Sequence, residues 1–242
     1  MSSKPDEIAD ERPPPLTCVW LGRCAFDDAL ALQLAARERL ADGDGEPVLF
    51  LVEHPPAVTL GRRASREDLR WSEQRLADDG VGVYDTPRGG QATLHAPGQL
   101  VVYPVLKVGR RIRAHIVRLA EVAIGLLEEL GVTGAAFRMD HPGVWIGERK
   151  IASIGIHVSR GVTIQGLSVN LDVDSRLFDA LVSCGLKDVE IVSASALGAR
   201  PITIEEAARR YAVLFAESLA RAESPVSDGT VVWRTREQLA EA

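Results

Sequence analysis

Residues 143–169, GVWIGERKIASIGIHVSRGVTIQGLSV, decide the fold class of this chain. The stretch holds three segments rich in β-branched residues, at 144–146, 151–158 and 162–169, which are separated by short polar turns that contain glycine. Segments of this kind, joined by tight turns, are typical of strands that pair in the antiparallel sense. The sequence therefore predicts an antiparallel sheet in this half of the chain.

Helical patterns are found on both sides of that stretch. Apolar residues recur at helical spacing over 113–130, and a glycine follows that is placed to end the helix. Another helix is expected over 27–40, before a turn-forming Asp-Gly-Asp-Gly run. A further helix begins at a capping box formed by Thr203 and Glu206 and continues through Leu219.

The N-terminal half supplies further strands. A short strand is expected over 17–21, and the continuous apolar run at 48–52 is typical of a buried central strand. Residues 57–60, beyond a His-Pro-Pro turn, are expected to form the neighbour of that strand. Strands and helices together predict an α/β chain of the α+β type, with a mainly antiparallel sheet and flanking helices.

The domain organisation is simple. Residues 1–16 are polar, acidic and end in three prolines before Leu16, so they are expected to form a disordered N-terminal arm. No internal repeat or linker follows, and a single catalytic domain is expected over 17–222, with a C-terminal tail at 223–242. A small C-terminal lobe is an open alternative.

Composition excludes several classes of protein. The formal net charge of −6 argues against a nucleic-acid binder, because such binding depends on Lys and Arg that neutralise phosphates. No apolar run reaches the roughly 18 residues that cross a bilayer, and the N-terminus lacks the pattern of a secretory signal. Three cysteines without metal-ligand spacing support neither a disulfide framework nor a zinc site. A cytoplasmic protein without a bound metal is expected.

The most unusual stretch is RGGQATLHAPGQ at 88–99. Its glycines allow a backbone to approach a ligand closely, and Arg88 and His95 could contact the polar end of that ligand. The alternative is a glycine-rich hairpin that carries a surface histidine. A phosphate-binding loop is excluded, because no Lys-Ser or Lys-Thr follows the glycines at the required spacing.

Two single residues are candidates for chemistry. Lys150 follows a polar turn and begins a strand of small and apolar residues, and the alternative for it is a solvated hairpin lysine. Cys184 stands between Ser183 and Gly185, and a lone cysteine is more often a small buried hydrophobe than a nucleophile. Cys18 and Cys24 have the same alternative, and nothing in their surroundings favours reactivity.

Several segments, in order from about Leu21 to Leu219, resemble the lipoyl(octanoyl) transferase family. The resemblance rests on EHPP at 53–56, TLGR at 59–62, the 88–99 stretch, GVWI at 143–146, KIASIG at 150–155, GLSVN at 166–170 and SCG at 183–185. Ala96 and Ser183 depart from residues that are common in that family, glycine and proline respectively, and both are small.

The resemblance implies an activity and a fold. Members of the family transfer octanoyl from octanoyl-acyl carrier protein to a lysine of lipoyl domains, and the fold is expected to be that of biotin and lipoate protein ligases. Cys184 matches the nucleophile that forms an acyl thioester, and Lys150 the lysine that lowers its pKa. The segments that match substrate-binding residues are Arg88, Gly89, Gly90, Gln91, Ala92, Thr93, Leu94, His95, Ser153, Ile154, Gly155, Gly166, Leu167 and Ser168.

The same resemblance implies partners and no cofactor. The donor is octanoyl-acyl carrier protein, and the acceptors are lipoyl domains of 2-oxoacid dehydrogenases and the glycine cleavage H protein; the chain is expected to be a monomer. Because acyl carrier proteins are acidic, docking requires a local basic surface. Two clusters qualify: Arg62, Arg63 and Arg66, and Lys107, Arg110, Arg111 and Arg113.

Two other functions compete with this one. An ATP-dependent lipoate or biotin protein ligase would share the fold but would activate a free acid. A non-catalytic protein that binds acyl carriers or lipoyl domains would keep the fold without turnover. Dependence on ATP separates the first alternative from a transferase, and formation of a covalent octanoyl adduct separates the second.

Overall fold

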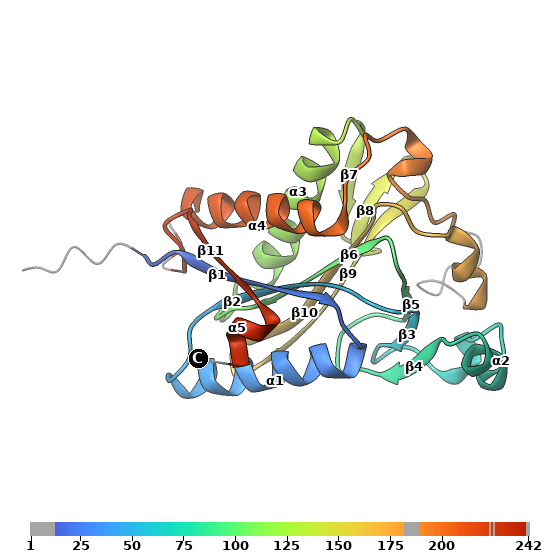
Figure 1. Cartoon of the computed structure of the whole chain (residues 1–242), viewed down its shortest axis with the longest axis horizontal. Coiled ribbons are helices and arrows are strands. Elements are labelled where there is room, and N and C mark those ends of the chain that lie inside the picture. The colour runs from blue at the N-terminus through green and yellow to red at the C-terminus, as the bar shows by residue number, and fades with distance from the viewer. Residues whose placement is uncertain (1–12, 182–188, 223, 225, 241–242) are drawn as a thin grey trace, which may run out of the picture.

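The computed structural model describes residues 13–181, 189–222, 224 and 226–240. Their centre is an eight-stranded sheet with the order β11-β1-β2-β6-β10-β9-β8-β7 (Figure 1). The strands are β1 (Leu16–Arg23), β2 (Val48–Glu53), β6 (Gln99–Val105), β7 (Ala135–Arg138), β8 (Gly143–Ile146), β9 (Arg149–Ser159), β10 (Val162–Asn170) and β11 (Val231–Thr235). From β2 to β7 every neighbouring pair is antiparallel, which confirms the predicted sheet type.

Helices cover both faces of this sheet. Helices α3 (Ile112–Glu129) and α4 (Ile204–Arg221) lie together on one face, while α1 (Phe26–Asp42) lies on the other with the short α5 (Arg236–Ala240) nearby (Figure 1). The capping box of α4 forms as predicted: the Thr203 hydroxyl accepts from the Glu206 amide at 3.2 Å, and the Glu206 carboxylate accepts from the Thr203 amide at 2.9 Å. The three helices expected from the sequence are therefore confirmed.

A second, three-stranded sheet lies at one end of the molecule. Its order is β4-β3-β5, formed by β3 (Ala57–Leu60), β4 (Gly82–Asp85) and β5 (Ala92–His95), with α2 (Glu73–Asp78) and the one-turn helix η1 (Arg66–Asp68) beside it. The expectation that residues 57–60 pair with 48–52 is wrong. Both edges of β2 are occupied, by β1 and β6, and two prolines without amide donors carry the chain out of the sheet.

The last residues extend the main sheet. Residues 223–242 were expected to form a tail after the domain, yet β11 pairs in parallel with β1, with Cys18 opposite Trp233. The Arg209 guanidinium of α4 lies 4.3 Å from the centre of the Trp233 ring and holds this edge strand against the helix. The sequence did not predict this strand, because it is a short, half-buried edge strand in which apolar and polar residues do not alternate.

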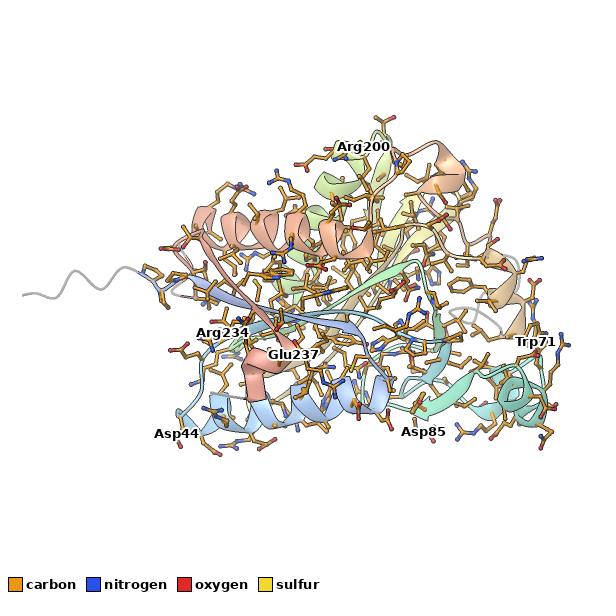
Figure 2. The ribbon with its side chains drawn as sticks, viewed as in Figure 1. Asp44, Trp71, Asp85, Arg200, Arg234 and Glu237 are labelled. Atoms are coloured by element: carbon orange, nitrogen blue, oxygen red, sulfur yellow. The ribbon has the colours of Figure 1, made fainter. Side chains whose placement is uncertain are left out.

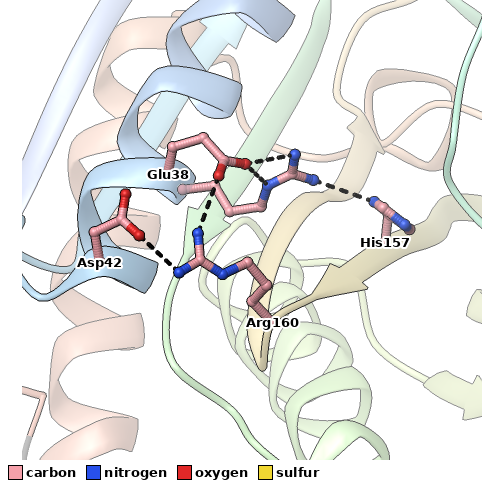
Figure 3. A network of polar contacts seen from close by, with 5 residues as sticks. Glu38, Asp42, His157 and Arg160 are labelled. Atoms are coloured by element: carbon pink, nitrogen blue, oxygen red, sulfur yellow. Dashed lines mark hydrogen bonds and ion pairs between the residues drawn. The ribbon is translucent and has the colours of Figure 1, made fainter.

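Charged side chains join α1 to the β9–β10 hairpin (Figure 3). Arg160 at the hairpin turn pairs with Glu38 at 3.3 Å and with Asp42 at 2.6 Å. Arg37 contacts both Glu38 and the Nδ1 atom of His157, the latter at 3.5 Å. Exposed pairs contribute little singly, but a connected set fixes the geometry of the hairpin relative to the helix.

In Figure 2, Trp71 and Asp85 lie at the end that carries the smaller sheet, and Asp85 there pairs with Arg66 at 2.9 Å. In the part of the chain that the structure describes, no helix is long and apolar enough to cross a membrane.

Candidate active site

A pocket lies where the smaller sheet meets β6, β9 and β10. About 620 Å³ of space lies between its walls, a figure that includes open solvent. Its lining consists of Arg63, Arg88, Gly90, Gln91, Ala92, Thr93, His95, Val101, Tyr103, Asp140, His141, Pro142, Lys150, Ser153, Ile154, Gly155, Gln165, Gly166, Leu167 and Ser168. The structure thus brings three separate sequence segments, at 88–95, 150–155 and 166–168, to one cavity.

Of the sequence-predicted residues that the structure describes, Leu94 and Gly89 are not in this lining. Leu94 is fully buried in the core of the smaller sheet. Gly89 lies behind the pocket wall, where its amide donates to the carbonyl of Ile156 at 2.9 Å. Cys184 lies outside the described residues.

Arg88 fastens the glycine-rich segment to its surroundings. One of its terminal nitrogens donates to the carbonyl and to the hydroxyl of Thr59, at 2.6 and 2.8 Å, and the other donates to the Gly89 carbonyl at 3.2 Å. Its side chain is 6% exposed. This burial excludes, for this part of the loop, the alternative of a glycine-rich hairpin on the surface. The arginine therefore cross-links the residues of the pocket wall.

The glycines around Arg88 leave the space that its side chain occupies. A Cβ atom on Gly61 would lie 2.5 Å from the Gly90 carbonyl oxygen and 2.7 Å from an Arg88 nitrogen. A Cβ on Gly155 would lie 3.1 Å from both Arg88 Cδ and the Gly89 carbonyl oxygen. The requirement for glycine at these positions therefore comes from close packing of strands β3 and β9 against the 88–90 segment.

Lys150 is buried at the start of β9. It is 3% exposed, and its Nζ atom lies 5.3 Å from the centre of the Trp145 ring. Gly143 gives the side chain room, because a Cβ at that position would come within 2.6 Å of Lys150 Cε. The structure excludes a solvated hairpin lysine, because the side chain is buried in the wall of the pocket.

Residues 190–192, which follow Cys184 closely in the sequence, pair with the backbone of Lys150. The Lys150 amide donates to the Glu190 carbonyl at 2.9 Å, and the Val192 amide donates to the Lys150 carbonyl at 3.0 Å. Residues 190–192 therefore continue the sheet at the backbone of Lys150, as a bridge between Lys150 and Ile191 also shows.

A chain of hydrogen bonds through two side-chain amides fixes the orientation of the His95 ring. The Asn170 amide donates to the Val192 carbonyl at 3.2 Å, the Gln99 amide donates to Asn170 Oδ1 at 2.8 Å, and Gln99 Oε1 lies 2.7 Å from His95 Nδ1. Because Gln99 uses its nitrogen toward two carbonyl-type oxygens, its oxygen accepts, so His95 Nδ1 carries the proton. Nε2 of His95 is left with a lone pair as a hydrogen-bond acceptor.

His95 and the adjacent His54 are neutral. Burial, with the charge effects of His54 and Arg88, lowers the pKa of His95 to about 3, and burial lowers the pKa of His54 to about 4. His54 Nδ1 donates to the Cys24 carbonyl at 2.7 Å, which leaves Nε2 to accept from the Tyr103 hydroxyl at 2.9 Å. At neutral pH these groups orient neighbouring atoms and carry no charge.

Gln165 was missed by the sequence reasoning. It lies in the middle of β10 with φ of 62°, a left-handed backbone conformation that is uncommon for a residue with a side chain. The Gln33 side chain of α1, itself fully buried, accepts from the Gln165 amide at 2.8 Å and holds this conformation. The side-chain Nε2 of Gln165 is buried and has no hydrogen-bond partner in the described part of the chain. A strained residue with an unsatisfied amide in a pocket wall is a candidate for ligand binding.

The two other cysteines are unsuited to nucleophilic chemistry. Cys18 is fully buried, and burial raises the pKa of its thiol to about 12. Cys24 is 2% exposed, and burial raises its pKa as well. Since the thiolate is the reactive form, both act as small core residues, which leaves Cys184 as the candidate nucleophile among the three.

The two basic clusters differ in their relation to the pocket. Arg63 lines its rim, and the amides of Arg62 and Arg63 donate to the carbonyls of Arg88 and Gly90, each at 3.0 Å. Lys107 and Arg111 line a different cavity, beside α3. No group of three or more potential metal ligands occurs among the residues that the structure describes.

Comparison with known structures defines the class of fold. The chain is similar to a bipartite lipoate protein ligase of Thermoplasma acidophilum, with a TM-score of 0.68 over 94% of this chain and 91% of that one, at 17% identity. The molecule therefore has the fold of lipoate protein ligases.

Sequence comparison defines the family. The model of the lipoyl protein ligase A/B catalytic domain matches residues 26–216. The octanoyltransferase of Alkaliphilus metalliredigens is 36% identical over 84% of this chain and 94% of its own length, and that of Desulfovibrio desulfuricans is 42% identical over 75% and 77%. The chain belongs to the lipoyl protein ligase A/B family and, within it, to the octanoyltransferases.

Proposed function

We propose that this chain transfers an octanoyl group from octanoyl-acyl carrier protein to a lysine of lipoyl domains, through a thioester on Cys184. The observation that carries the proposal is the buried Lys150 ammonium, held in the wall of the pocket that collects the 88–95, 150–155 and 166–168 segments. Octanoyltransferase relatives that match along most of the chain support the acyl group, and a lipoate ligase studied with its E2 lipoyl domain supports the class of acceptor.

The role proposed for Lys150 is to stabilise the Cys184 thiolate. A thiol with a pKa of about 8.5 is only a few per cent ionised at neutral pH. Ionising half of it at pH 7 needs about 2 kcal/mol, and one positive charge about 4 Å away supplies up to about 4 kcal/mol at an effective dielectric of 20. A single lysine is therefore sufficient.

The reaction proceeds in two transfers. The Cys184 thiolate attacks the donor thioester and forms a new carbon–sulfur bond, while the phosphopantetheine thiolate leaves and takes up a proton relayed by Lys150. The amine of the target lysine then attacks the Cys184 thioester, loses its proton to Lys150 and forms the amide, which releases the Cys184 thiolate. Thioester exchange is nearly balanced and amide formation is downhill, so no nucleotide is consumed.

The pocket suits a narrow acyl chain. Gly90, Gly155 and Gly166 line it and add no side-chain bulk, and Ile154 and Leu167 supply apolar contact. An octanoyl tail offers up to about 5 kcal/mol of burial, at roughly 0.8 kcal/mol for each of its methylene groups. In the same lining, the His95 acceptor and the Gln165 carboxamide are available for polar atoms of the donor.

The carrier is proposed to dock at Arg62 and Arg63. Both are exposed, and Arg63 belongs to the pocket rim, whereas Arg66 of the same cluster is already paired with Glu73 and Asp85. An acidic carrier would thus deliver its thioester next to the 88–91 segment. We also propose that the enzyme acts as a monomer in the cytoplasm, and that residues 17–222 form the catalytic domain, whose main sheet β11 completes.

Nucleotide dependence tests the proposal against the ligase alternative. Purified enzyme, octanoyl-acyl carrier protein and a lipoyl domain are combined without ATP, and the mass of the lipoyl domain is followed. We expect full octanoylation, and we expect none from free octanoate with ATP. Modification only in the second reaction would identify a ligase.

An Arg63→Glu variant should raise KM for the carrier and leave kcat for a small octanoyl thioester unchanged.

A further inference from the structure

A separate cavity, with both apolar and basic residues in its lining, lies beside α3, apart from the pocket described above. It encloses about 660 Å³, part of which is open to solvent, and it lies between the turn that follows β6, helix α3 and the C-terminal end of α4. Four basic side chains line it: Lys107, Arg111, His115 and Arg118. No acidic residue is part of the described lining, so positive charge is concentrated there, although Glu121 of α3 attracts Arg118 from outside the lining.

His115 is the unusual member of this set. It is 2% exposed, and neither ring nitrogen has a hydrogen-bond partner among the residues that the structure describes. A buried imidazole without a partner loses the hydrogen bonds that it made to water in the unfolded chain. An oxygen-bearing ligand in the cavity would accept from the ring N–H and remove that deficit.

The start of α3 adds a second attraction for an anion. The N-cap residue Arg111 makes no side-chain cap, and the first turn contains no acidic residue. The free N–H groups and the positive end of an 18-residue helix therefore lie at the edge of the cavity lined by Arg111. None of Lys107, Arg111 and Arg118 forms an ion pair with the described part of the chain.

We propose that this cavity binds a phosphate monoester, with the phosphate at Arg111, His115 and Arg118 and the organic part against Leu219 and Val226. The two apolar residues line the opposite wall, which comes from the end of α4 and the chain after it. A dianion matches two arginines and a helix start, and an apolar wall favours an ester over the free ion. The site is separate from the acyl pocket and does not rest on the proposed transfer reaction.

Binding is followed at constant ionic strength by the imidazole signals of His115 and by calorimetry, with n-butyl phosphate and inorganic phosphate as probes. We expect n-butyl phosphate to bind about tenfold more tightly, because its methylene groups leave water. The charged groups that line the cavity with His115 are Lys107, Arg111 and Arg118, and Leu219 of the α4 wall carries no charge. Glu121 of α3 acts on Arg118 from outside the lining. Burial and the charge of Arg118 lower the pKa of His115 to about 4, so a bound anion should raise that pKa.

Matched variants separate a built site from general attraction to positive charge. Arg118→Gln should weaken binding at least about tenfold, the effect of losing a charged hydrogen bond. Arg113→Gln removes the same charge from the same helix at a residue outside the cavity lining, and it should change affinity less than about threefold. Equal losses in the two variants, unchanged His115 signals in the wild-type protein, or equal affinity for the two probes would overturn the proposal.

Discussion

Gly155 and Gly89 both belong to the segments matched to substrate binding, yet the structure gives them different requirements. A Cβ on Gly155 would lie 3.1 Å from Arg88 Cδ and from the Gly89 carbonyl oxygen, closer than the 3.4 Å at which ordinary contact begins. The two contacts lie on the same side, so Gly155→Ala should push the 88–90 segment away from β9 by a few tenths of an ångström. A Cβ on Gly89 would meet only the Ile156 carbonyl oxygen, at 3.7 Å.

The expected magnitudes follow from packing energies. Overpacking of this kind costs about 1–3 kcal/mol, and each 1.4 kcal/mol lost from the productive geometry lowers the rate tenfold. Gly155→Ala should therefore lower kcat/KM for octanoyl transfer by about tenfold or more and lower the free energy of unfolding by about 1–2 kcal/mol. Gly89→Ala should leave kcat/KM within about twofold and stability within about 1 kcal/mol, because the new methyl group fits.

Transfer kinetics with a small octanoyl thioester and urea unfolding of both variants provide the test. The small donor is used so that docking of a carrier protein does not enter the comparison. If Gly89→Ala is as damaging as Gly155→Ala, the glycines are needed for direct contact with substrate, and the packing argument around Arg88 is refuted. If Gly155→Ala has no effect on either measurement, the close approach of the 88–90 segment to β9 is not important for the site.

Three further predictions follow from buried polar groups. Lys150→Met should lower transfer at least about tenfold while changing the free energy of unfolding by no more than about 1 kcal/mol, since methionine fills a similar volume; a parallel loss of stability would assign Lys150 a structural role. Gln165→Met should lower kcat/KM by about tenfold without loss of stability, because the Gln165 Nε2 has no protein partner to lose; unchanged kinetics would remove it from the site. Burial lowers the pKa values of His54, His95 and His115 to between about 3 and 4. Protonation therefore destabilises the folded state, so the free energy of unfolding has its full value above pH 6.5 and falls as the pH decreases toward 4. Together they change the free energy of unfolding by about 4 kcal/mol per pH unit, which urea unfolding can measure, and His115→Leu should remove about a third of this slope. A free energy of unfolding that stays constant between pH 6.5 and 4.5 would contradict their burial as neutral rings.

Local patterns were sufficient to predict the elements that lie near one another in the sequence. The turns between 143 and 169 fixed an antiparallel arrangement, and the capping box at Thr203 marked the start of α4. Residues 57–60 were recognised as a strand but assigned to the wrong sheet. Their partners, β4 and β5, depend on contacts across many residues that no local pattern encodes.

The site was predicted in part, because its chemistry depends on burial. The motif at 150–155 identified Lys150, but only the packing of Gly143 and Trp145 around it shows a buried ammonium. Nothing in the sequence distinguishes Gln165 from an ordinary strand residue, since its left-handed φ is imposed by Gln33 from a distant helix. The sequence also gave no reason to prefer Arg63 over the cluster near α3.

The most direct test of the account is the intact mass of the enzyme after incubation with octanoyl-acyl carrier protein, without ATP and without acceptor. The account predicts one octanoyl adduct on the wild-type chain, no adduct on Cys184→Ala, and slow formation on Lys150→Met. An unmodified wild-type chain that nevertheless octanoylates a lipoyl domain would contradict the thioester on Cys184, and an adduct retained in Cys184→Ala would place the nucleophile elsewhere.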